Sequence, residues 1–530
     1  MKVTIKAIGL LVFLSLILTQ GAFAQRFVIA DSQGDWGPLA PFLHAARGPG
    51  YVYTSFVFDS LLWRDTEGQL QPLIATDWQY ESDTRCYRFS LHPEAQWHDG
   101  QALTASDVVF SFNYLKQHQY RFVDLGAVNE VVAIQDADAK EAVRVCLNAE
   151  SPLFLTNVAA SLPIIPEHIY ATVTDPLRFS HQQATTGSGP YQLTEYDRTQ
   201  GFYRLVAHSQ HHLGKPVYDE LLLVRMTPQA ARSAIQNGEV NAMSIPHQQV
   251  AQFRSAGVSV FSELSHHPAR LLFNHQARFS SVQARQGIAY LIDRENLAEI
   301  AYQGYAQPAR VGYRQDIQDD LMRSYLFSPL KGAQLLSEAG WQQDRRGRWL
   351  DAQNSRVALR LVAQSSLETV AQLLAYQLEN AGFVVTLRLE QDVQLDQRLS
   401  AGSYDLALVS SSHLGDPDRF RLMILGQQAR SDRYLDDSEL LALLDEQRFV
   451  LDPIRRMALI QQAEERYRML LPSLPLVNPE NHVAVSNQSL GVGYSHGGIA
   501  LGVPLPFNKM ALFWPDFQPV DHVDEALVSE

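Results

Sequence analysis

Histidine side chains are the most conspicuous chemical groups in this sequence, because imidazole binds metals and transfers protons near neutral pH. One cluster consists of His208, His211 and His212. On a helix, this spacing would direct several imidazoles toward one metal ion. The Gly-Lys-Pro run at 214–216 follows at once and favours a surface turn instead. We therefore expect no metal site, and the sequence indicates no other cofactor.

Another histidine, His98, stands in the run Trp97-His98-Asp99-Gly100. A His–Asp pair can perform acid–base catalysis, but neighbouring residues on a strand point to opposite faces, and Asp-Gly favours a turn. The sequence also has no His-Glu-x-x-His motif and no phosphate-binding glycine loop. We therefore expect no catalytic residues. A secreted hydrolase is the alternative from a different class.

A polar segment at 410–418 follows directly after a predicted strand. Strands are predicted at 357–362, 383–389 and 404–409, with helices between them. This β-α-β-α-β order is typical of a parallel sheet, which binds ligands beyond the carboxyl ends of its strands. The candidate ligand contacts in this segment are Ser410, Ser411, Ser412, His413 and Asp416. The alternative for the histidine is a loop residue hydrogen-bonded to backbone.

Two of the predicted helices carry capping signals. Thr104 and Asp107 form a capping pair ahead of a helix with the apolar side Val108, Val109, Phe112 and Leu115. Ser365 and Glu368 form a similar pair ahead of the helix between the first two of the strands above. Its apolar face and its terminating glycine are Leu367, Val370, Leu374, Leu378 and Gly382. Strands and helices alternate, so the class is α/β.

The N-terminus has the three parts of a secretory signal peptide. Lys2 and Lys6 supply positive charge, residues 7–18 are apolar, and Ala22 and Ala24 match the cleavage pattern. The apolar run is shorter than the ~20 residues that span a bilayer. We therefore expect residues 1–24 to be removed and the chain to be periplasmic in a Gram-negative cell, with an opening strand at 26–30. An uncleaved anchor is the alternative.

Size and charge restrict the class further. The remaining roughly 500 residues are too many for one hydrophobic core, so at least two lobes are expected. The hydrophobic content of 46% is that of a globular protein. The net charge is −14, and no run of Lys or Arg offsets it. This charge argues against nucleic acid or an anionic membrane as the partner.

Only two cysteines occur, Cys86 and Cys146. Both lie in segments of alternating pattern whose apolar residues point away from the cysteine, so we expect each cysteine on the polar side of a strand. If the two strands are neighbours, an oxidising compartment permits a disulfide that closes a loop of about 60 residues. Two unpaired thiols are the alternative.

Several ordered motifs resemble those of the extracellular solute-binding protein family 5, the dipeptide-, oligopeptide- and nickel-binding receptors of ABC importers. They are Tyr-Arg-Phe-Ser-Leu at 87–91, Trp-His-Asp-Gly at 97–100, the segment 104–111, Gly-Ser-Gly-Pro-Tyr at 187–191, Gly-Lys-Pro at 214–216, the segment 285–294, Gly-Asp-Pro-Asp at 415–418 and Leu-Pro-Ser-Leu-Pro-Leu at 471–476. Each motif is weak by itself. Their order along the whole mature chain carries the resemblance.

The resemblance implies a two-lobed periplasmic binding protein of type II, a clamp that closes on its ligand, with an extra subdomain in lobe I. Lobe I would contain residues 25–265 and 479–530, and lobe II residues 266–478. The two chain crossings between them would form a hinge. The partners would be a peptide or another small molecule and the membrane permease of the importer, and the protein would be a monomer. A chaperone-like role without transport is a further alternative.

The resemblance also implies where a peptide would bind. In peptide receptors of the family, the ligand's main chain pairs with protein backbone at two places, which here are residues 31–36 and 410–412. The contacts in the first place would be Gln33, Gly34, Asp35 and Trp36. The aspartate with which the family binds the peptide's ammonium corresponds here to His413, which carries no negative charge. This departure motivates the alternative of a metal chelate or another modified ligand.

Overall fold

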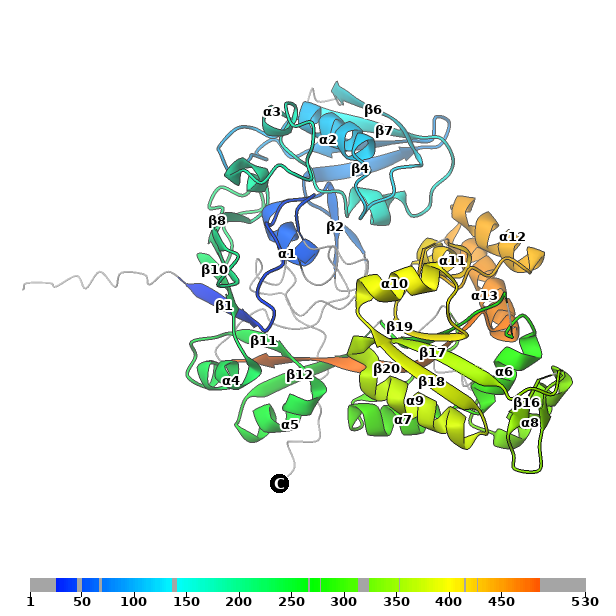
Figure 1. The fold of residues 1–530 in the computed structure, drawn as a ribbon. Helices are drawn as coiled ribbons and strands as arrows, with labels where there is room; N and C mark the ends of the chain where they lie inside the picture. The colour runs from blue at the N-terminus through cyan, green and yellow to red at the C-terminus, as the bar shows by residue number, and fades with distance from the viewer. Residues whose placement is uncertain are drawn as a thin grey trace, which may run out of the picture.

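Two α/β lobes make up the described part of this computed structural model, and Figure 1 shows them side by side. The described residues are 25–44, 50–65, 69–135, 141–265, 267–276, 278–312, 324–351, 353–413, 416–426 and 428–486. The expected signal peptide (1–24) and the last 44 positions assigned to lobe I (487–530) lie outside these ranges. Within them, no helix is long and apolar enough to cross a membrane.

The sheet of lobe I is built around its first strand. The predicted opening strand is confirmed as β1, which pairs in parallel with β10 and β11, and antiparallel partners extend the sheet. These strands are β1 (Arg26–Asp31), β8 (Tyr191–Asp197), β9 (Phe202–Ala207), β10 (Glu220–Arg225) and β11 (Ala242–Ile245). The motif at 187–191 leads directly into β8.

A second, four-stranded antiparallel sheet forms the subdomain of lobe I, with α2 packed against it. Its elements are β4 (Ala75–Glu81), β5 (Cys86–Leu91), α2 (Ala105–Gln117), β6 (Val128–Gln135) and β7 (Glu141–Leu147). The predicted capping pair is confirmed, because the Thr104 backbone N–H donates to Asp107 Oδ2 at 2.9 Å. Val108, Phe112 and Leu115 are buried as expected, and Val109 is partly buried.

The two cysteines lie directly opposite each other on neighbouring strands, β5 and β7. Their sulfur atoms form a disulfide with an S–S distance of 2.07 Å. Both cysteines lie on the same face of the small sheet as Arg88 and Arg144, which agrees with the expected polar side of the strands. Their side chains are nevertheless buried, with Cys86 2% exposed and Cys146 9% exposed.

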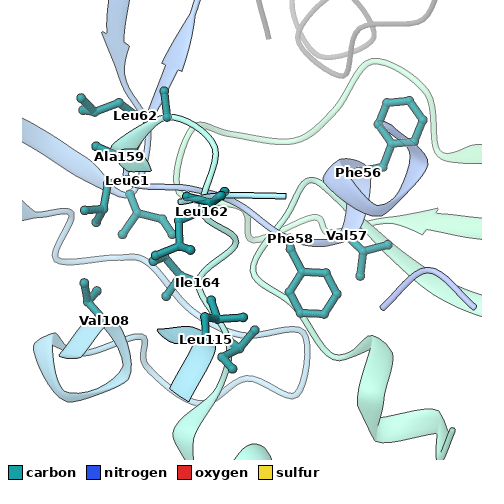
Figure 2. Packing of buried hydrophobic residues seen from close by; sticks show 14 of the residues in the cluster. Phe56, Val57, Phe58, Leu61, Leu62, Val108, Leu115, Ala159, Leu162 and Ile164 are labelled. Atoms are coloured by element: carbon teal, nitrogen blue, oxygen red, sulfur yellow. The ribbon is translucent and has the colours of Figure 1, made fainter. Parts of the chain in front are cut away.

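The core of lobe I joins the subdomain to the main sheet. Figure 2 shows Phe58 and Leu61, from the stretch after α1, pointing toward Leu162 and Ile164. Leu115 of α2 lies beside them, so segments distant in sequence share one cluster. Burying each such side chain contributes about 1.5–3 kcal/mol relative to exposure. The subdomain is therefore packed into lobe I.

Lobe II contains the predicted β-α-β-α-β unit. It consists of β17 (Ala358–Gln364), α9 (Glu368–Asn380), β18 (Val384–Glu390), α10 (Asp392–Ser400) and β19 (Leu406–Ser410). Both β18 and β19 pair in parallel with β17, which confirms the predicted parallel sheet. The predicted N-cap at Ser365 is wrong. Ser365 begins a short 3-10 turn, and α9 starts only after Leu367.

Strand β20 (Ser473–Val485) belongs to both lobes, and Figure 1 shows it as the orange arrow between them. Its first half pairs with β13 (Ala269–Phe273) and β14 (Ala306–Pro308) of lobe II. Its second half pairs with β11 and with β12 (Ser259–Leu264) of lobe I. The chain therefore crosses between the lobes twice, once within β20 and once between β12 and β13.

The remaining elements surround these sheets. In lobe I they are α1 (Gly50–Val57), β2 (Leu62–Arg64), β3 (Leu70–Pro72), the π-helical turn η1 (Phe154–Ala159), α3 (Glu167–Tyr170), η2 (Gln182–Thr185), α4 (Pro228–Gln236) and α5 (His247–Ser255). In lobe II they are α6 (Val282–Tyr290), α7 (Arg294–Tyr302), α8 (Pro329–Glu338), β15 (Gln342–Gln343), β16 (Trp349–Leu350), η4 (Ser365–Leu367), α11 (Pro417–Leu425), α12 (Ser438–Glu446), η5 (Gln447–Phe449) and α13 (Pro453–Leu470).

Candidate functional site

The strand registers bring the two predicted ligand segments toward the same stretch of β20. From lobe I, Ala30 lies beside Met243 of β11, which pairs with Ala484. β1 runs toward the crossing, because β11 pairs progressively earlier residues of β20 along its length. From the other side, Ser410 lies beside Ala269, which pairs with Val477. The carboxyl ends of β1 and β19 therefore approach the crossing from opposite lobes.

The first segment is held in a tight turn by Asp31, the last residue of β1. Its Oδ1 accepts from the backbone N–H groups of Gln33 (2.7 Å) and Gly34 (2.9 Å), and its Oδ2 accepts from Trp36 Nε1 (2.9 Å). Gly34 has a φ of +83°, and a Cβ there would lie 2.6 Å from Arg225 Cβ. Only glycine suits both the left-handed backbone and this close approach.

Asp35 and Trp36 are fixed by tyrosines of the neighbouring strands. Asp35 Oδ1 accepts from Tyr196 of β8 (2.6 Å), and the backbone N–H of Trp36 donates to the Tyr203 hydroxyl of β9 (2.8 Å). The carboxylate also pairs with Arg198 at 3.3 Å. These hydrogen bonds outweigh partial burial and hold the pKa of Asp35 below its usual value. The segment after β1 is therefore half-buried and held in one conformation.

The second segment is held by side chains of lobe II. The backbone N–H of Ser410 donates to Gln364 Oε1 at 3.1 Å, and Arg270 Nε donates to Ser411 Oγ at 3.0 Å. Arg270 is almost completely buried and pairs with Asp432 at 2.6 Å. Ser410, Ser411 and Ser412 are all partly exposed. A buried ion pair therefore positions the end of this loop.

His413 is 6% exposed, and its ring packs edge-on against Phe420 with centroids 5.5 Å apart. Its carbonyl oxygen accepts from the backbone N–H of Asp416 at 2.9 Å. Edge-to-face ring contacts and burial hold an imidazole in one orientation. The His413 side chain therefore lies in the predicted segment, but the surrounding protein covers most of it.

Asp416 is the N-cap of α11. Its Oδ1 accepts from the backbone N–H groups of Asp418 (2.7 Å) and Arg419 (3.2 Å). Burial raises the pKa of the Asp416 carboxyl, opposed by the Arg419 charge 4.0 Å away and by these N–H donors. A capping carboxylate of this kind is engaged by the protein itself.

The other oxygen of Asp416 accepts a hydrogen bond from Asn157 Nδ2. Asn157 belongs to η1 of lobe I, 259 positions earlier in the chain, so this bond joins the two lobes. Burial raises the pKa of Tyr51 in α1 to about 12, and the Arg419 charge of α11, across the same boundary, opposes this rise. The sequence analysis did not single out Asn157, because an isolated asparagine carries no motif.

His98 and Asp99, which were considered above for catalysis, bind different partners. His98 Nδ1 accepts from the backbone N–H of Gly187 (3.2 Å), and its Nε2 lies 2.9 Å from the Gly189 carbonyl oxygen. Asp99 instead pairs with His168 at 2.7 Å. A Cβ at residue 187 would lie 1.9 Å from the Val57 carbonyl oxygen, so this turn must be glycine. The Trp97–Gly100 motif therefore holds the turn at 187–191 in place and has a structural role.

A surface cavity of about 420 Å³ lies elsewhere, in lobe II. Its walls come from α6, α8 and α13 and include Tyr290, Lys331 and Arg468. None of its lining residues belongs to the two predicted segments. The arrangement at the crossing, where two strands end between two lobes, is that of a two-lobed α/β binding protein.

Comparison with known proteins agrees with this class. Residues 69–432 match the family described as "Bacterial extracellular solute-binding proteins, family 5 Middle". The match covers well over half of the chain, and the protein belongs to this family.

Three similar proteins illustrate the range of relatives. A putative ABC transporter peptide-binding protein of Brucella ovis is 26% identical over 319 residues, which span 59% of this chain and 59% of that relative. The oligopeptide-binding protein AppA of Bacillus subtilis is 22% identical, over 77% of this chain and 78% of its own. The structure of NikA from Brucella suis in complex with Fe(III)-EDTA is similar in fold, with a TM-score of 0.75, 19% identity and coverage of 91% and 100%.

Proposed function

We propose that this protein is the substrate-binding receptor of an ABC importer, and that it captures peptides between its lobes and delivers them to the membrane permease. The observation that supports it most is the approach of two strand ends to one crossing between two lobes, in a member of this family. One relative is named as a putative ABC transporter peptide-binding protein, and another as an oligopeptide-binding protein. Receptor function needs no catalytic residue, so we assign none.

The exposed backbone of both segments is the part of the proposed site that would pair with a peptide. In the first segment, the N–H groups of Gln33, Gly34 and Trp36 already donate within the protein. A peptide would therefore meet mainly carbonyl acceptors there. In the second, Ser410 N–H is engaged by Gln364. We propose recognition of peptide N–H groups by protein carbonyls, with side chains accommodated loosely.

Closure about the two crossings would provide the signal to the permease. We propose a hinge with lobe I at residues 25–265 and 479–530 and lobe II at residues 266–478. A micromolar ligand supplies about 8 kcal/mol of binding free energy, of which only the part specific to the closed state shifts the equilibrium. We also propose export by the N-terminal signal peptide to the periplasm, where the Cys86–Cys146 disulfide is compatible with the oxidising conditions.

The experiment that tests this proposal identifies the ligand that the protein carries. Protein purified from the periplasm without refolding is analysed by native mass spectrometry, and the ligand released by denaturation is sequenced. A mixture of short peptides is the expected result. A single chelate of fixed mass would overturn the peptide assignment, and hydrolysis of added peptides would overturn the receptor assignment.

A second candidate ligand is a metal chelate or another modified small molecule. It is favoured by the absence of a carboxylate at position 413 and by the engagement of Asp416 as a helix cap and as the acceptor of Asn157. Neither residue then offers a free carboxylate for a peptide ammonium. The same native mass spectrum distinguishes this candidate from the first.

A further inference from the structure

A buried cluster of one carboxylate and two imidazoles lies in lobe I, on elements other than those of the proposed ligand site. Asp59 stands between Phe58 and Leu61, whose side chains point into the core in Figure 2. His211 and His212 lie in the turn between β9 and β10. The predicted exposure of this turn is wrong for both histidines, because their side chains fold inward against the residues after α1.

The burial and spacing of these three residues set them apart from ordinary polar groups. Asp59, His211 and His212 expose 0%, 5% and 9% of their surfaces. One potential metal-ligand atom from each lies within 4.8 Å of the other two. The His211 and His212 rings are 4.2 Å apart. Burying this many polar nitrogens is costly unless each finds a partner.

The hydrogen bonding of His212 indicates the tautomer of a metal ligand. Its Nε2 lies 3.1 Å from the Leu73 carbonyl oxygen, which can only accept, so Nε2 carries the proton and Nδ1 carries the lone pair. Among the described residues, no hydrogen-bond partner reaches this buried Nδ1. Metal-bound histidines usually donate their other ring N–H to a carbonyl or carboxylate in this way. An unsatisfied buried acceptor requires an explanation, and an ion is one.

His211 and Asp59 already form a close pair, with Nε2 and Oδ2 2.9 Å apart. Donor atoms on one tetrahedral zinc ion lie about 3.3 Å apart, given bonds of about 2.0–2.1 Å. The pair therefore needs almost no movement to share an ion, and the third donor needs to approach by roughly 1–2 Å. The mobile part would be the short turn that carries both histidines.

We propose that Asp59, His211 and His212 bind one divalent transition-metal ion, for which Zn²⁺ is the best fit. Two imidazoles and one carboxylate are ligands that zinc accepts readily in a four-coordinate site, with water in the fourth position. The ion would tie the turn between β9 and β10 to the segment after α1. The site lies apart from the ligand site at the lobe crossing, and we expect the ion to link these two parts of lobe I.

Binding changes one proton position. His211 Nδ1 now accepts from the Leu213 backbone N–H at 3.2 Å, so Nε2 carries the ring proton toward Asp59. When Nε2 binds the ion, the ring proton moves to Nδ1 and this hydrogen bond is lost. A neutral hydrogen bond contributes only about 1 kcal/mol, and metal–ligand bonds offset it.

The test uses untagged, full-length protein freed of metal by EDTA and titrated with ZnCl₂ alone. We expect one Zn²⁺ per chain after gel filtration, measured by mass spectrometry of the metal, and a higher unfolding temperature with Zn²⁺. His212→Phe retains the ring and removes the donor, and Asp59→Asn removes a ligand charge. Each should raise the Kd for Zn²⁺ at least tenfold, the effect of losing an interaction at a metal site.

His181→Asn is the matched control, because His181 is exposed and an asparagine can still cap η2. Its Kd should equal that of the parent. Absence of stoichiometric Zn²⁺ in the parent, equal affinity in His212→Phe, or equal losses in His181→Asn would overturn the proposal. If the variants do not fold, Co²⁺ added to the parent decides, since weak octahedral rather than intense tetrahedral absorption would also overturn it. Peptide affinity should not change in any variant, so the receptor proposal is tested separately.

Discussion

The side chain of His413 lies against Phe420 with 6% of its surface exposed, at the position where the family resemblance places a charged anchor for a peptide. A neutral imidazole offers one acceptor and no charge to an ammonium group. The carboxylate of Asp416, three residues later, already accepts hydrogen bonds from backbone N–H groups of α11 and from Asn157. The identity of this one residue therefore bears strongly on which ligands bind.

His413→Asp should strengthen the binding of peptides with a free amino terminus, because a carboxylate would pair with the ammonium group. A charge-assisted hydrogen bond contributes about 1.5–3 kcal/mol, which corresponds to a roughly 10- to 100-fold lower Kd. Isothermal titration of one peptide, with its amino terminus free or acetylated, measures this effect. An equal change for both forms of the peptide would place the amino terminus elsewhere in the site.

His98 is a second single residue with a testable role, since it bonds to both glycines of the 187–191 turn as a neutral ring. Burial lowers the pKa of His98 to about 4, whereas an unfolded chain protonates histidine near 6.5. The unfolded state therefore binds more protons between these values. The stability contributed by neutral His98 is complete above pH 6.5 and is lost as the pH falls toward 4.

His98→Gln should reduce the loss of stability between pH 6.5 and 4, because it removes this titrating group. The free energy of unfolding at neutral pH should fall by about 1 kcal/mol for each hydrogen bond lost. Urea unfolding at intervals of pH gives the slope, which should decrease by up to one bound proton relative to the parent. An identical slope in the two proteins would mean that His98 is not the group that titrates.

At the scale of elements, the small sheet of lobe I depends on a cross-strand disulfide. Cys86 of β5 and Cys146 of β7 are direct partners in the strand register and are 60 positions apart in sequence. A link over such a loop restricts the unfolded chain, and loop-entropy estimates for this length give about 4 kcal/mol. The same sheet packs on α2 and the rest of the lobe I core.

The double variant Cys86→Ser, Cys146→Ser should therefore lower the free energy of unfolding of lobe I by about 2–4 kcal/mol. Urea unfolding with and without dithiothreitol measures it, and the parent with dithiothreitol should approach the variant. The variant itself should not respond to the reductant. A parent that is equally stable with and without reductant would show that the link does not limit the unfolded state.

At the scale of the whole molecule, the two lobes touch through the side chain of Asn157 and the cap of α11. The contact uses a residue of η1 in lobe I and no residue of the two proposed ligand segments apart from Asp416. A bond that exists only when the lobes are together stabilises the closed state by its own free energy. The η1 turn would then take part in closure.

Asn157→Ala should raise the Kd of the co-purified ligand about 5- to 100-fold, because it leaves the buried Asp416 oxygen without this donor at a cost of about 1–3 kcal/mol. Ser161→Ala is the control: Ser161 lies just after η1, and its hydroxyl donates to the Thr156 carbonyl oxygen within lobe I. Calorimetry gives the Kd values, and small-angle X-ray scattering gives the compactness of each ligand-free protein. Equal affinities for the two variants would argue against a role in closure.

Local sequence patterns determined much of the fold of this protein. Short-range rules of hydrogen bonding and alternation account for three features. These are the capping by Thr104 and Asp107, the parallel strands of lobe II and the turn at 187–191. The predicted start of α9 differs from the structure because residues Ser365–Leu367 form a 3-10 turn and the α-helix begins only at Glu368. Helix boundaries are the least predictable part of an element.

The sequence by itself also indicated the family and the two loops that follow β1 and β19. Only the tertiary structure decided what their side chains do, because burial and hydrogen-bond partners depend on segments far apart in the chain. Asn157 meets Asp416 across 259 positions, and His211 and His212 turn inward toward Asp59 rather than toward solvent. No pattern of neighbouring residues contains such contacts. They arise when packing of the hydrophobic cores fixes which polar groups meet.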